Sequence, residues 1–203
     1  SKLPGAVVVG AHYDHVGVGG ENSLSDTPGA VHHGADDNAS GVAGLLQIAT
    51  ELAGDRALRR DVYFIAFTGE ENGLLGSKFY VEHMSPDVAP IAMLNMDMIG
   101  RLRSNRLRIV GTTTATEWAR LATVACTRYR VLCMMGGDGY GPSDHSSFTS
   151  AGIPVLNFST GSHADYHKPS DDVGKLDYAA MTQVTALALG VVDDIVHDGP
   201  AFI

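Results

Sequence analysis

The sequence has few cysteines, a shortage of basic residues and no hydrophobic run of membrane length. Its 203 residues include 14 lysines and arginines against 23 aspartates and glutamates, which gives a net charge of −9. Nucleic acid is therefore not an expected partner, because its recognition needs a basic surface. No apolar run reaches the ~18 residues of a membrane span. Cys126 and Cys133 form no metal-type cluster, and they either pair or stay free; two cysteines do not define a redox compartment.

The chain also shows no signal peptide, internal repeat, low-complexity tract or linker. Residues 1–5 lead directly into an apolar segment. Such an abrupt start indicates a domain taken from a longer parent protein that has further N-terminal sequence, so the missing signal says little about location. Since 44% of the residues are hydrophobic, we expect residues 1–203 to form one globular domain with a full core.

Short apolar runs alternate with amphipathic segments along the chain. Val7, Val8 and Val9 form a continuous β-branched run, which is typical of a strand buried on both faces. The alternation predicts an α/β fold with helices on both faces of the sheet, a three-layer α/β/α sandwich around a mixed, mostly parallel sheet. The predicted strands are 6–10, 61–67, 91–96, 107–110, 130–134 and 153–158, and the predicted helices are 40–53, 74–83, 114–129 or 116–129, 143–148 and 178–197.

Two adjacent acids stand out between the first predicted strand and helix. Asp36 and Asp37 lie in Gly-Ala-Asp-Asp-Asn-Ala-Ser-Gly, residues 34–41, where Asn38 or Ser40 is the expected helix cap. In an open α/β sheet, ligands bind at this rim of the strands. Adjacent carboxylates repel each other, so we expect a cation, and a metal ion is the simplest choice.

Further acids and histidines follow the other predicted strands. Each alone has an ordinary explanation, such as a local hydrogen bond or a solvated turn, but their shared position at one rim indicates a site. Imidazole and carboxylate ligands suit zinc, with cobalt or manganese as substitutes, and the lack of thiolates favours an open catalytic site. Five ligands exceed the usual three of a catalytic zinc, and they divide between two metals if one carboxylate bridges. The five places are His12 with Asp14, Asp37 in its loop, Glu70 with Glu71, Asp97, and Tyr166 with His167.

Six motifs that run from residue 12 to residue 167 together resemble peptidase family twenty-eight, a family of di-zinc aminopeptidases. They are His12-Tyr-Asp-His15, Gly34-Ala-Asp-Asp-Asn-Ala-Ser-Gly41, Gly69-Glu-Glu-x-Gly-Leu-Leu-Gly-Ser77, Asn95-Met-Asp97, Ser143-Asp-His-x-x-Phe148 and Tyr166-His167. The resemblance implies that His12 and Asp97 bind one zinc, that Glu71 and His167 bind the other, and that Asp37 bridges the two.

The resemblance also implies the remaining roles. Glu70 is the general base, the Asp14 carboxylate orients His12, Tyr166 hydrogen-bonds the oxyanion, and the Asp36–Asp37 peptide is cis. The implied enzyme is a metallo-aminopeptidase that uses a water bridging two zinc ions to hydrolyse the N-terminal bond of peptides with a free N-terminus. A secreted or periplasmic location is favoured by the same resemblance; the oligomeric state is not readable.

Three alternatives remain. A carboxypeptidase, dipeptidase or deacylase of the related co-catalytic zinc family has similar ligands, but its second motif differs from residues 34–41. Glutaminyl cyclase uses one zinc and transferase chemistry. A non-catalytic module, as in receptor ectodomains of this fold, has lost ligands that are retained here.

Several other residues receive a structural interpretation first. Asp144 and His145 are expected to organise a helix start, and Asp171 to accept hydrogen bonds. His15 and His163 are weak metal candidates. The substrate's first side chain, with a Leu-like residue as the first guess, has a candidate pocket at Met134, Met135, Gly136 and Gly137.

Overall fold

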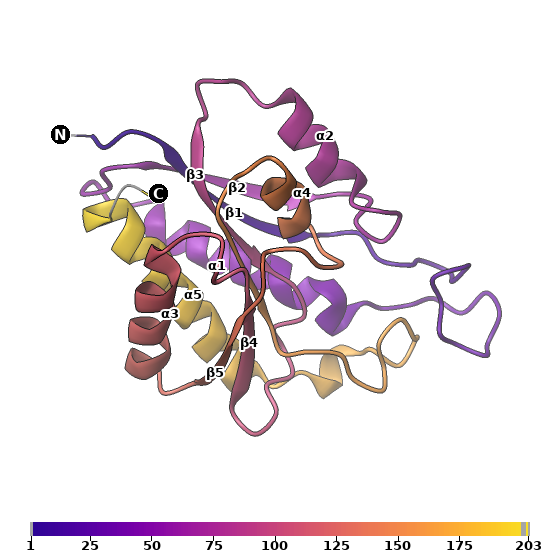
Figure 1. Ribbon diagram of the computed structural model, residues 1–203. Helices are drawn as coiled ribbons and strands as arrows, with labels where there is room; N and C mark the ends of the chain where they lie inside the picture. The colour runs from indigo at the N-terminus through magenta and orange to yellow at the C-terminus, as the bar shows by residue number, and fades with distance from the viewer. Residues whose placement is uncertain (1, 200–201, 203) are drawn as a thin grey trace.

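The computed structural model describes residues 2–199 and 202, and it is built on a six-stranded sheet (Figure 1). The strand order is β2-β1-β3-β6-β4-β5. All neighbouring strands are parallel except β4 and β6, which pair antiparallel. The prediction of a mixed, mostly parallel sheet is confirmed. The strands are β1 (Ala6–His12), β2 (Asp61–Phe67), β3 (Pro90–Met96), β4 (Arg106–Val110), β5 (Leu132–Gly136) and β6 (Val155–Ser159).

Helices cover both faces of the sheet, which confirms the three-layer arrangement. Successive residues of a strand point to opposite faces, and the buried valines of β1 show this directly. Val7 and Val9 belong to the larger core cluster with α1, α3 and α5, whereas Val8 packs with Phe148 in a second cluster beneath α2 and α4. The helices are α1 (Gly41–Leu52), α2 (Leu75–His83), α3 (Glu117–Arg128), α4 (His145–Ser150) and α5 (Tyr178–Asp198).

Helix α5 has the length and composition of a membrane span, contrary to the expectation from the sequence. Residues Tyr178–His197 form a 20-residue stretch in which the most apolar 18 residues have a mean hydropathy of 1.4, and half of those residues are buried. In the structure Val184, Leu187 and Val191 are fully buried in the larger core cluster. A long helix that packs against the core of a protein meets the same criterion, which accounts for the match.

The other differences from the predicted elements are local. Strand β1 extends two residues further than expected, to His12, and strand β5 begins at Leu132 because Arg130 adopts a left-handed conformation with φ 56°. The apolar run of 61–67 also predicted a buried strand, but β2 is an edge strand with several exposed residues. A short 3-10 turn at Val173–Lys175 was not predicted.

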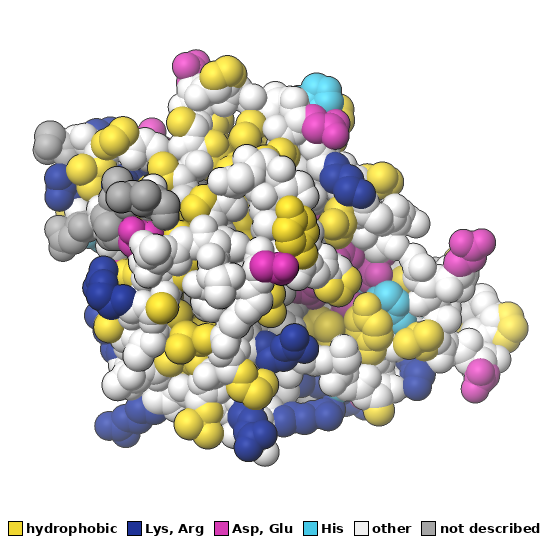
Figure 2. Space-filling model, viewed as in Figure 1, with side chains coloured by type: hydrophobic (Ala, Val, Ile, Leu, Met, Phe, Trp, Pro, Cys, Tyr) yellow, Lys and Arg dark blue, Asp and Glu magenta, His cyan; other side chains and the backbone are white. Residues whose placement is uncertain are grey.

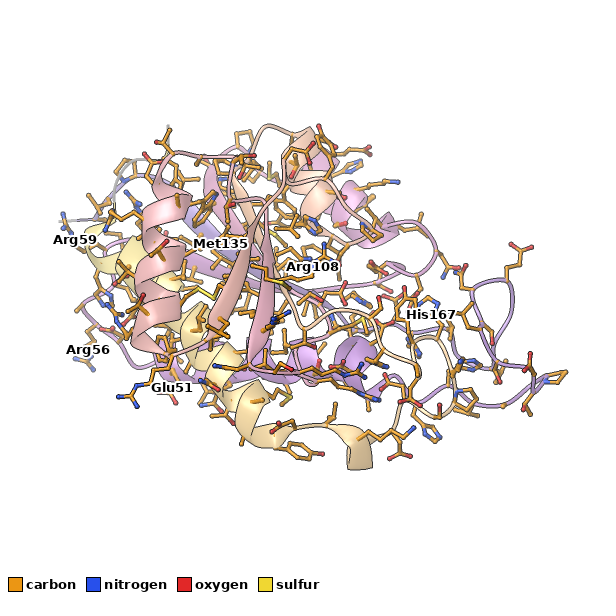
Figure 3. The ribbon with its side chains drawn as sticks, turned by 60° about the horizontal axis from the view of Figure 1, so that its bottom comes forward. Glu51, Arg56, Arg59, Arg108, Met135 and His167 are labelled. Carbon is orange, nitrogen blue, oxygen red and sulfur yellow. A yellow bond between two sulfur atoms is a disulfide. The ribbon has the colours of Figure 1, made fainter. Side chains whose placement is uncertain are left out.

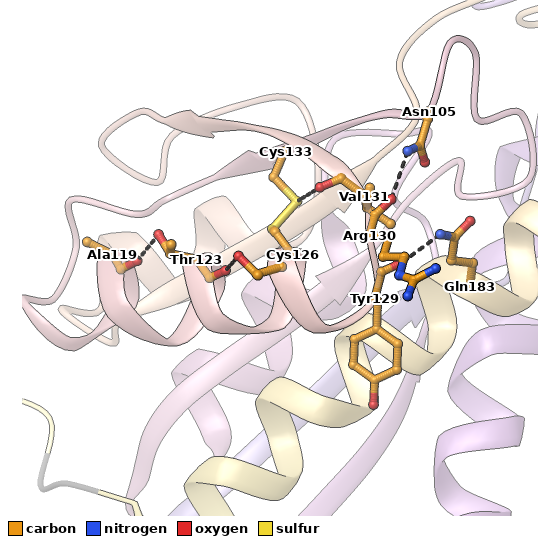
Figure 4. Close-up of a disulfide and its surroundings, with 10 residues drawn as sticks. Asn105, Ala119, Thr123, Cys126, Tyr129, Arg130, Val131, Cys133 and Gln183 are labelled. Atoms are coloured by element: carbon orange, nitrogen blue, oxygen red, sulfur yellow. Dashed lines mark hydrogen bonds between the residues drawn. A yellow bond between two sulfur atoms is a disulfide. The ribbon is translucent and has the colours of Figure 1, made fainter.

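Cys126 and Cys133 form a disulfide, which decides between the two states left open by the sequence. The bond joins α3 to β5 across a Cα–Cα distance of 6.1 Å (Figure 4). Cys133 therefore faces the layer of α3 and α5, and its neighbours Leu132 and Met134 point to the other face of the sheet, where both are exposed.

Candidate active site

Four neighbouring parallel strands bring the candidate ligands to one edge of the sheet. Strands β2, β1, β3 and β6 are consecutive in the sheet and run in the same direction, so their carboxyl ends meet. His12 ends β1, Glu70 and Glu71 follow β2 after two residues, and Asp97 follows β3 directly. The loop after β6 carries His167 back to the same edge.

The stretch from residue 34 to residue 41 is anchored to the end of β3. The Asn38 amide donates to the Met96 carbonyl at 3.0 Å, and its oxygen accepts the Gly41 and Met98 N–H groups at 3.0 and 3.2 Å. A Cβ on Gly41 would lie 2.4 Å from the Met96 oxygen, so this position requires glycine. Asn38 is thus the residue that caps α1, and Ser40 donates to Asp36 instead.

The cis peptide in this stretch lies one residue later than the resemblance implied. It joins Asp37 to Asn38, not Asp36 to Asp37. Both flanking residues have non-helical backbone angles, and Asn38 is held by the β3 contacts described above.

Asp171 positions the two acids through their backbone. Its Oδ2 accepts the N–H groups of Asp36 and Asp37 at 2.9 and 3.0 Å, and its Oδ1 accepts a hydrogen bond from Arg101 at 2.5 Å. Asp171 is fully buried, and Arg101 also pairs with Asp165 at 2.6 Å. This is the hydrogen-bond acceptor role expected for Asp171.

The first of two clusters surrounds His12. Its Nε2 lies 3.4 Å from Asp37 Oδ1 and 3.6 Å from Asp97 Oδ1. Burial alone would lower the pKa of this imidazole, but the carboxylates of Asp37 and Asp97 outweigh burial and raise its pKa to about 12. An imidazole in such surroundings needs a positive charge, which either a proton or a metal ion supplies.

The second cluster uses the other oxygen of Asp37. His167 Nε2 lies 3.2 Å from Asp37 Oδ2 and 3.0 Å from Glu71 Oε2, while its Nδ1 contacts the Asn22 carbonyl at 2.7 Å. Burial opposes protonation of His167, yet the two carboxylates raise its pKa to about 10. Burial likewise opposes ionisation of Asp37, but His12 and His167 lower its pKa below the usual range. Asp37 therefore lies between the clusters with one oxygen facing each.

His15 joins the second cluster more closely than the sequence suggested. Its Nδ1 lies 2.9 Å from Glu71 Oε1 and 3.9 Å from Asp37 Oδ2. The signal was present in His12-Tyr-Asp-His15, but one imidazole of the motif was sufficient for the predicted ligand set. His163, the other weak candidate, contacts Asp36 at 3.1 Å and so supports the turn rather than the clusters.

The donor atoms fit metal ions. His12, Asp37 and Asp97 offer ligand atoms within 4.8 Å of one another, as do His15, Asp37 and Glu71. Buried polar atoms are normally hydrogen-bonded, but Asp37 Oδ2, His167 Nε2 and His15 Nε2 form no hydrogen bond with a described residue, although His167 Nε2 lies within 3.2 Å of Asp37 Oδ2. Two imidazole–carboxylate sets that share a carboxylate, with buried atoms left unsatisfied, suit a pair of zinc ions.

Asp14 contacts His12 differently from the prediction. The Asp14 carbonyl oxygen lies 3.1 Å from His12 Nδ1, whereas its carboxylate is 3.9 Å away. The carboxylate instead accepts the N–H groups of Glu70 and Glu71 at 3.2 and 3.3 Å, which draws it toward the turn after β2. Asp14 thus fixes His12 through its backbone and the two glutamates through its side chain.

A cavity of about 210 Å³ opens beside the clusters. Its wall includes Glu70 and Tyr166, and in Figure 2 acidic side chains lie in a depression of this face, with basic side chains toward β4 and β5. Burial raises the pKa of Glu70 to about 9, and Asp97, Asp144 and Glu71 add to the effect. The Tyr166 ring stacks on His167 with centroids 3.8 Å apart. Burial raises the pKa of the Tyr166 hydroxyl.

The model of peptidase family M28 matches residues 1–192. The chain belongs to this family. A probable leucine aminopeptidase of Arthroderma otae is 31% identical over 195 residues, covering 91% of this M28 chain and 52% of that protein. This M28 chain therefore spans about half the length of the curated relatives it matches.

Solved structures agree with the family. BSAP, a zinc aminopeptidase from Bacillus subtilis, is 27% identical with a TM-score of 0.79, covering 97% of this chain and 48% of that one. An aminopeptidase from Aneurinibacillus sp. strain AM-1 is 28% identical with a TM-score of 0.80, covering 98% and 46%. The matched part is thus the whole three-layer sandwich of this M28 chain.

One expectation about the site of the M28 chain was wrong, and another is confirmed only in part. Asp144 is the N-cap residue of α4, as expected, but its side chain makes no capping hydrogen bond, and both its oxygens are buried without a hydrogen bond to a described residue. Met134 and Met135 do not line the cavity, because β5 is the strand of the sheet farthest from the ligands on that side. Met98, Val110 and Tyr140 take part in the wall instead.

Proposed function

We propose that this chain is the catalytic domain of a zinc aminopeptidase that hydrolyses the first peptide bond of substrates with a free N-terminus. The observation that carries the proposal is Asp37, which presents one oxygen to His12 and the other to His167 beside the cavity that Glu70 lines. Neither cluster alone is unusual, but the shared carboxylate makes them one site.

In this proposal His12, Asp97 and Asp37 would hold one zinc ion. Glu71, His167 and the same Asp37 would hold the other. Cobalt or manganese would substitute, since they accept the same nitrogen and oxygen donors. Zinc bound there would supply a Lewis acid that lowers the pKa of a water and polarises the substrate carbonyl.

Glu70 moves the proton. It accepts a proton from the attacking water and returns it to the leaving amine, as a carboxylate at the cavity wall is placed to do. The pKa of about 9 that burial gives it belongs to the protein without cations; nearby positive charge lowers the pKa of a carboxyl group and makes it a base at neutral pH. The Tyr166 hydroxyl donates to the carbonyl oxygen as negative charge develops there.

The acids of the cavity wall explain why the proposed enzyme would act at a free N-terminus. A free α-amine is a cation at neutral pH, and the cavity wall beside the clusters contains Glu70, Glu71, Asp37 and Asp97. An acetylated N-terminus has no charge to pair with these carboxylates. The amine therefore fixes the first peptide bond next to Glu70.

The disulfide supports the proposed location. Disulfides persist in oxidising compartments and are rare in the cytosol of most organisms, and Cys126 is bonded to Cys133 here. A secreted or periplasmic protein agrees with this bond.

The test is hydrolysis of a Leu-initiated peptide compared with its N-acetylated twin, with zinc supplied and with a chelator as control. We expect cleavage of the free-amine peptide alone, and we expect the chelator to abolish it. Equal cleavage of both peptides would instead indicate an endopeptidase or deacylase. Chelator-insensitive cleavage would contradict the role given to the metals.

A further inference from the structure

The cavity of the candidate site has one wall that the proposed chemistry does not use. Strand β4 forms this wall with Arg108 and Val110. Alternate residues of the strand, Leu107 and Ile109, are fully buried in the core beneath α3 and α5. The side chains of Arg108 and Val110 therefore point to the opposite face, toward the cavity.

Arg108 is the only lysine or arginine among the cavity-lining residues of the described chain. Its guanidinium is exposed, and no carboxylate of residues 2–199 or 202 lies within ion-pair distance of it. The other titratable side chains of the wall are acids, histidines and tyrosines, and Asp37, Glu70 and Glu71 are among the acids. The cavity therefore has a negative end and a single positive group.

The register of the sheet gives the separation of the two ends. Arg108 pairs with Ser159 of β6, and the Asp97 N–H bonds the carbonyl of Phe158 in the same strand, so Asp97 and Arg108 lie at similar heights on either side of β6. Adjacent strands are ~4.8 Å apart, so two strand spacings place the backbones about 10 Å apart. Figure 3 shows Arg108 on the sheet between the labelled Met135 and His167.

A short peptide has the length and charges that this cavity requires. An extended residue spans ~3.3–3.6 Å, so two or three residues cover about 10 Å. A di- or tripeptide whose amine lies among the acids carries its carboxylate to the region of Arg108. Guanidinium binds carboxylate through two parallel hydrogen bonds, which favours this pairing over a neutral amide.

We propose that Arg108 is a specificity-determining residue that binds a carboxylate on the second or third residue of the substrate. The inference rests on the proposed aminopeptidase function, because the amine must be held at the acidic end. The carboxylate is either the C-terminus of a short peptide or an acidic side chain at the same position. Both sources have the same chemistry, and the substrates below distinguish them.

The experiment compares kcat/KM for matched peptides. Leu-Leu and Leu-Leu-Leu are each compared with their C-terminal amides, and Leu-Leu-Asp-amide is compared with Leu-Leu-Asn-amide. We expect roughly a tenfold advantage for at least one carboxylate-bearing peptide, mainly through KM, since a hydrogen-bonded charge pair contributes about that much. Arg108→Gln should remove the advantage and leave the neutral amides within about twofold, and Arg108→Lys should restore part of it.

The matched control is Arg106→Gln. Arg106 lies two residues earlier on the same face of β4 and is exposed, but it does not line the cavity. This variant should keep the carboxylate advantage. If the parent protein does not prefer the carboxylate-bearing peptides over the amides, or if Arg108→Gln still prefers them, the inference is wrong.

A binding measurement separates this inference from the proposed function. Calorimetry of Leu-Leu-Leu and its amide in the Glu70→Gln background needs no turnover. A preference for the free carboxylate that Arg108→Gln abolishes would support the Arg108 assignment even if no peptide were hydrolysed. Equal binding of the two peptides would reject it even if the neutral amides were good substrates.

Discussion

Single side chains in the site serve more than one neighbour. Asp37 faces two histidines, Asp171 holds two backbone N–H groups with one oxygen and Arg101 with the other, and the Asp14 carboxylate accepts the N–H groups of both Glu70 and Glu71. A substitution at such a residue therefore changes several contacts at once. Glu70 differs, because its carboxylate has no described hydrogen-bond partner to lose and instead faces the cavity.

Glu70→Gln is expected to separate chemistry from metal binding. The amide keeps the shape of the side chain but does not accept the proton, so kcat should fall by roughly 10²- to 10⁴-fold. Zinc content, measured by elemental analysis after dialysis, should not change. Glu82→Gln on the exposed part of α2 is the control and should keep full activity. Loss of zinc together with activity would show that Glu70 is a ligand instead.

Asp144→Asn is expected to change the pH dependence of stability in the metal-free protein. Burial raises the pKa of Asp144 to about 6, above the ~3.9 of an unfolded chain. The folded state therefore holds this proton more tightly, and the free energy of unfolding falls as pH rises from about 4 to 6.

The neutral amide avoids this loss. Above pH 6 the difference should approach roughly 3 kcal/mol in favour of the Asn variant, and below pH 4 the two should agree. Urea denaturation between pH 4 and 8 measures the difference, with the exposed Asp87→Asn as control. A difference that does not vary with pH would contradict the assignment to a buried charge.

At the scale of elements, the turn between β1 and α1 is the part of the site with the most supporting contacts. It is bound to the end of β3 by Asn38 and to the last loop by Asp171. These contacts join segments that lie far apart in the chain, so the turn has its observed shape only in the folded domain. Its ligand Asp37 is thus positioned by the backbone on both sides.

Asp171→Asn is the test of this support. The amide keeps one oxygen, loses the charge that Arg101 requires, and leaves a buried guanidinium with fewer partners. We expect zinc affinity to fall by about 10- to 100-fold, as for other residues that orient metal ligands, and unfolding to become easier. Asp172→Asn is the matched control, since its half-exposed carboxylate contacts the exposed His33 and the Gly174 N–H, and neither belongs to the turn that carries Asp37. Equal zinc affinity in the parent and Asp171→Asn would reject the role.

The sequence was most informative where local pattern decides structure. The β-branched run at Val7–Val9, the amphipathic pattern over 40–53 and the acids at strand ends predicted β1, α1 and the rim correctly. Local pattern does not say which partner a side chain meets across the sheet. The Asp14 carboxylate was therefore predicted to contact His12, whereas it accepts the Glu70 N–H. The contact between His15 and Glu71 was not predicted either. The sequence does not show that β4 runs antiparallel to β6. Met134 and Met135 were therefore predicted as cavity residues, and Arg108 was not considered.

On the scale of the whole molecule, the carboxylates gathered at one edge repel one another unless cations are present. Zinc should therefore raise the melting temperature of the metal-free domain, because it binds only the folded arrangement of these ligands. At a hundredfold excess over Kd the gain is ~2.7 kcal/mol, or roughly 5–10 °C for a domain of this size.

Calorimetric scans with zinc, with magnesium and with chelator provide the measurement. Magnesium should have little effect, because nitrogen ligands suit it poorly. A melting temperature that does not respond to zinc would show that the clusters do not bind the ion in the folded protein.

The antiparallel pairing of β4 with β6 separates two properties that many enzymes combine in the same residues. The candidate ligands come from β1, β2, β3 and the connecting loops, whereas Arg108 comes from a strand that enters the site from the opposite direction. Substitutions on β4 should therefore change the peptide specificity without shifting the backbone that carries the candidate ligands. Directed evolution of substrate range should begin with a library on that strand.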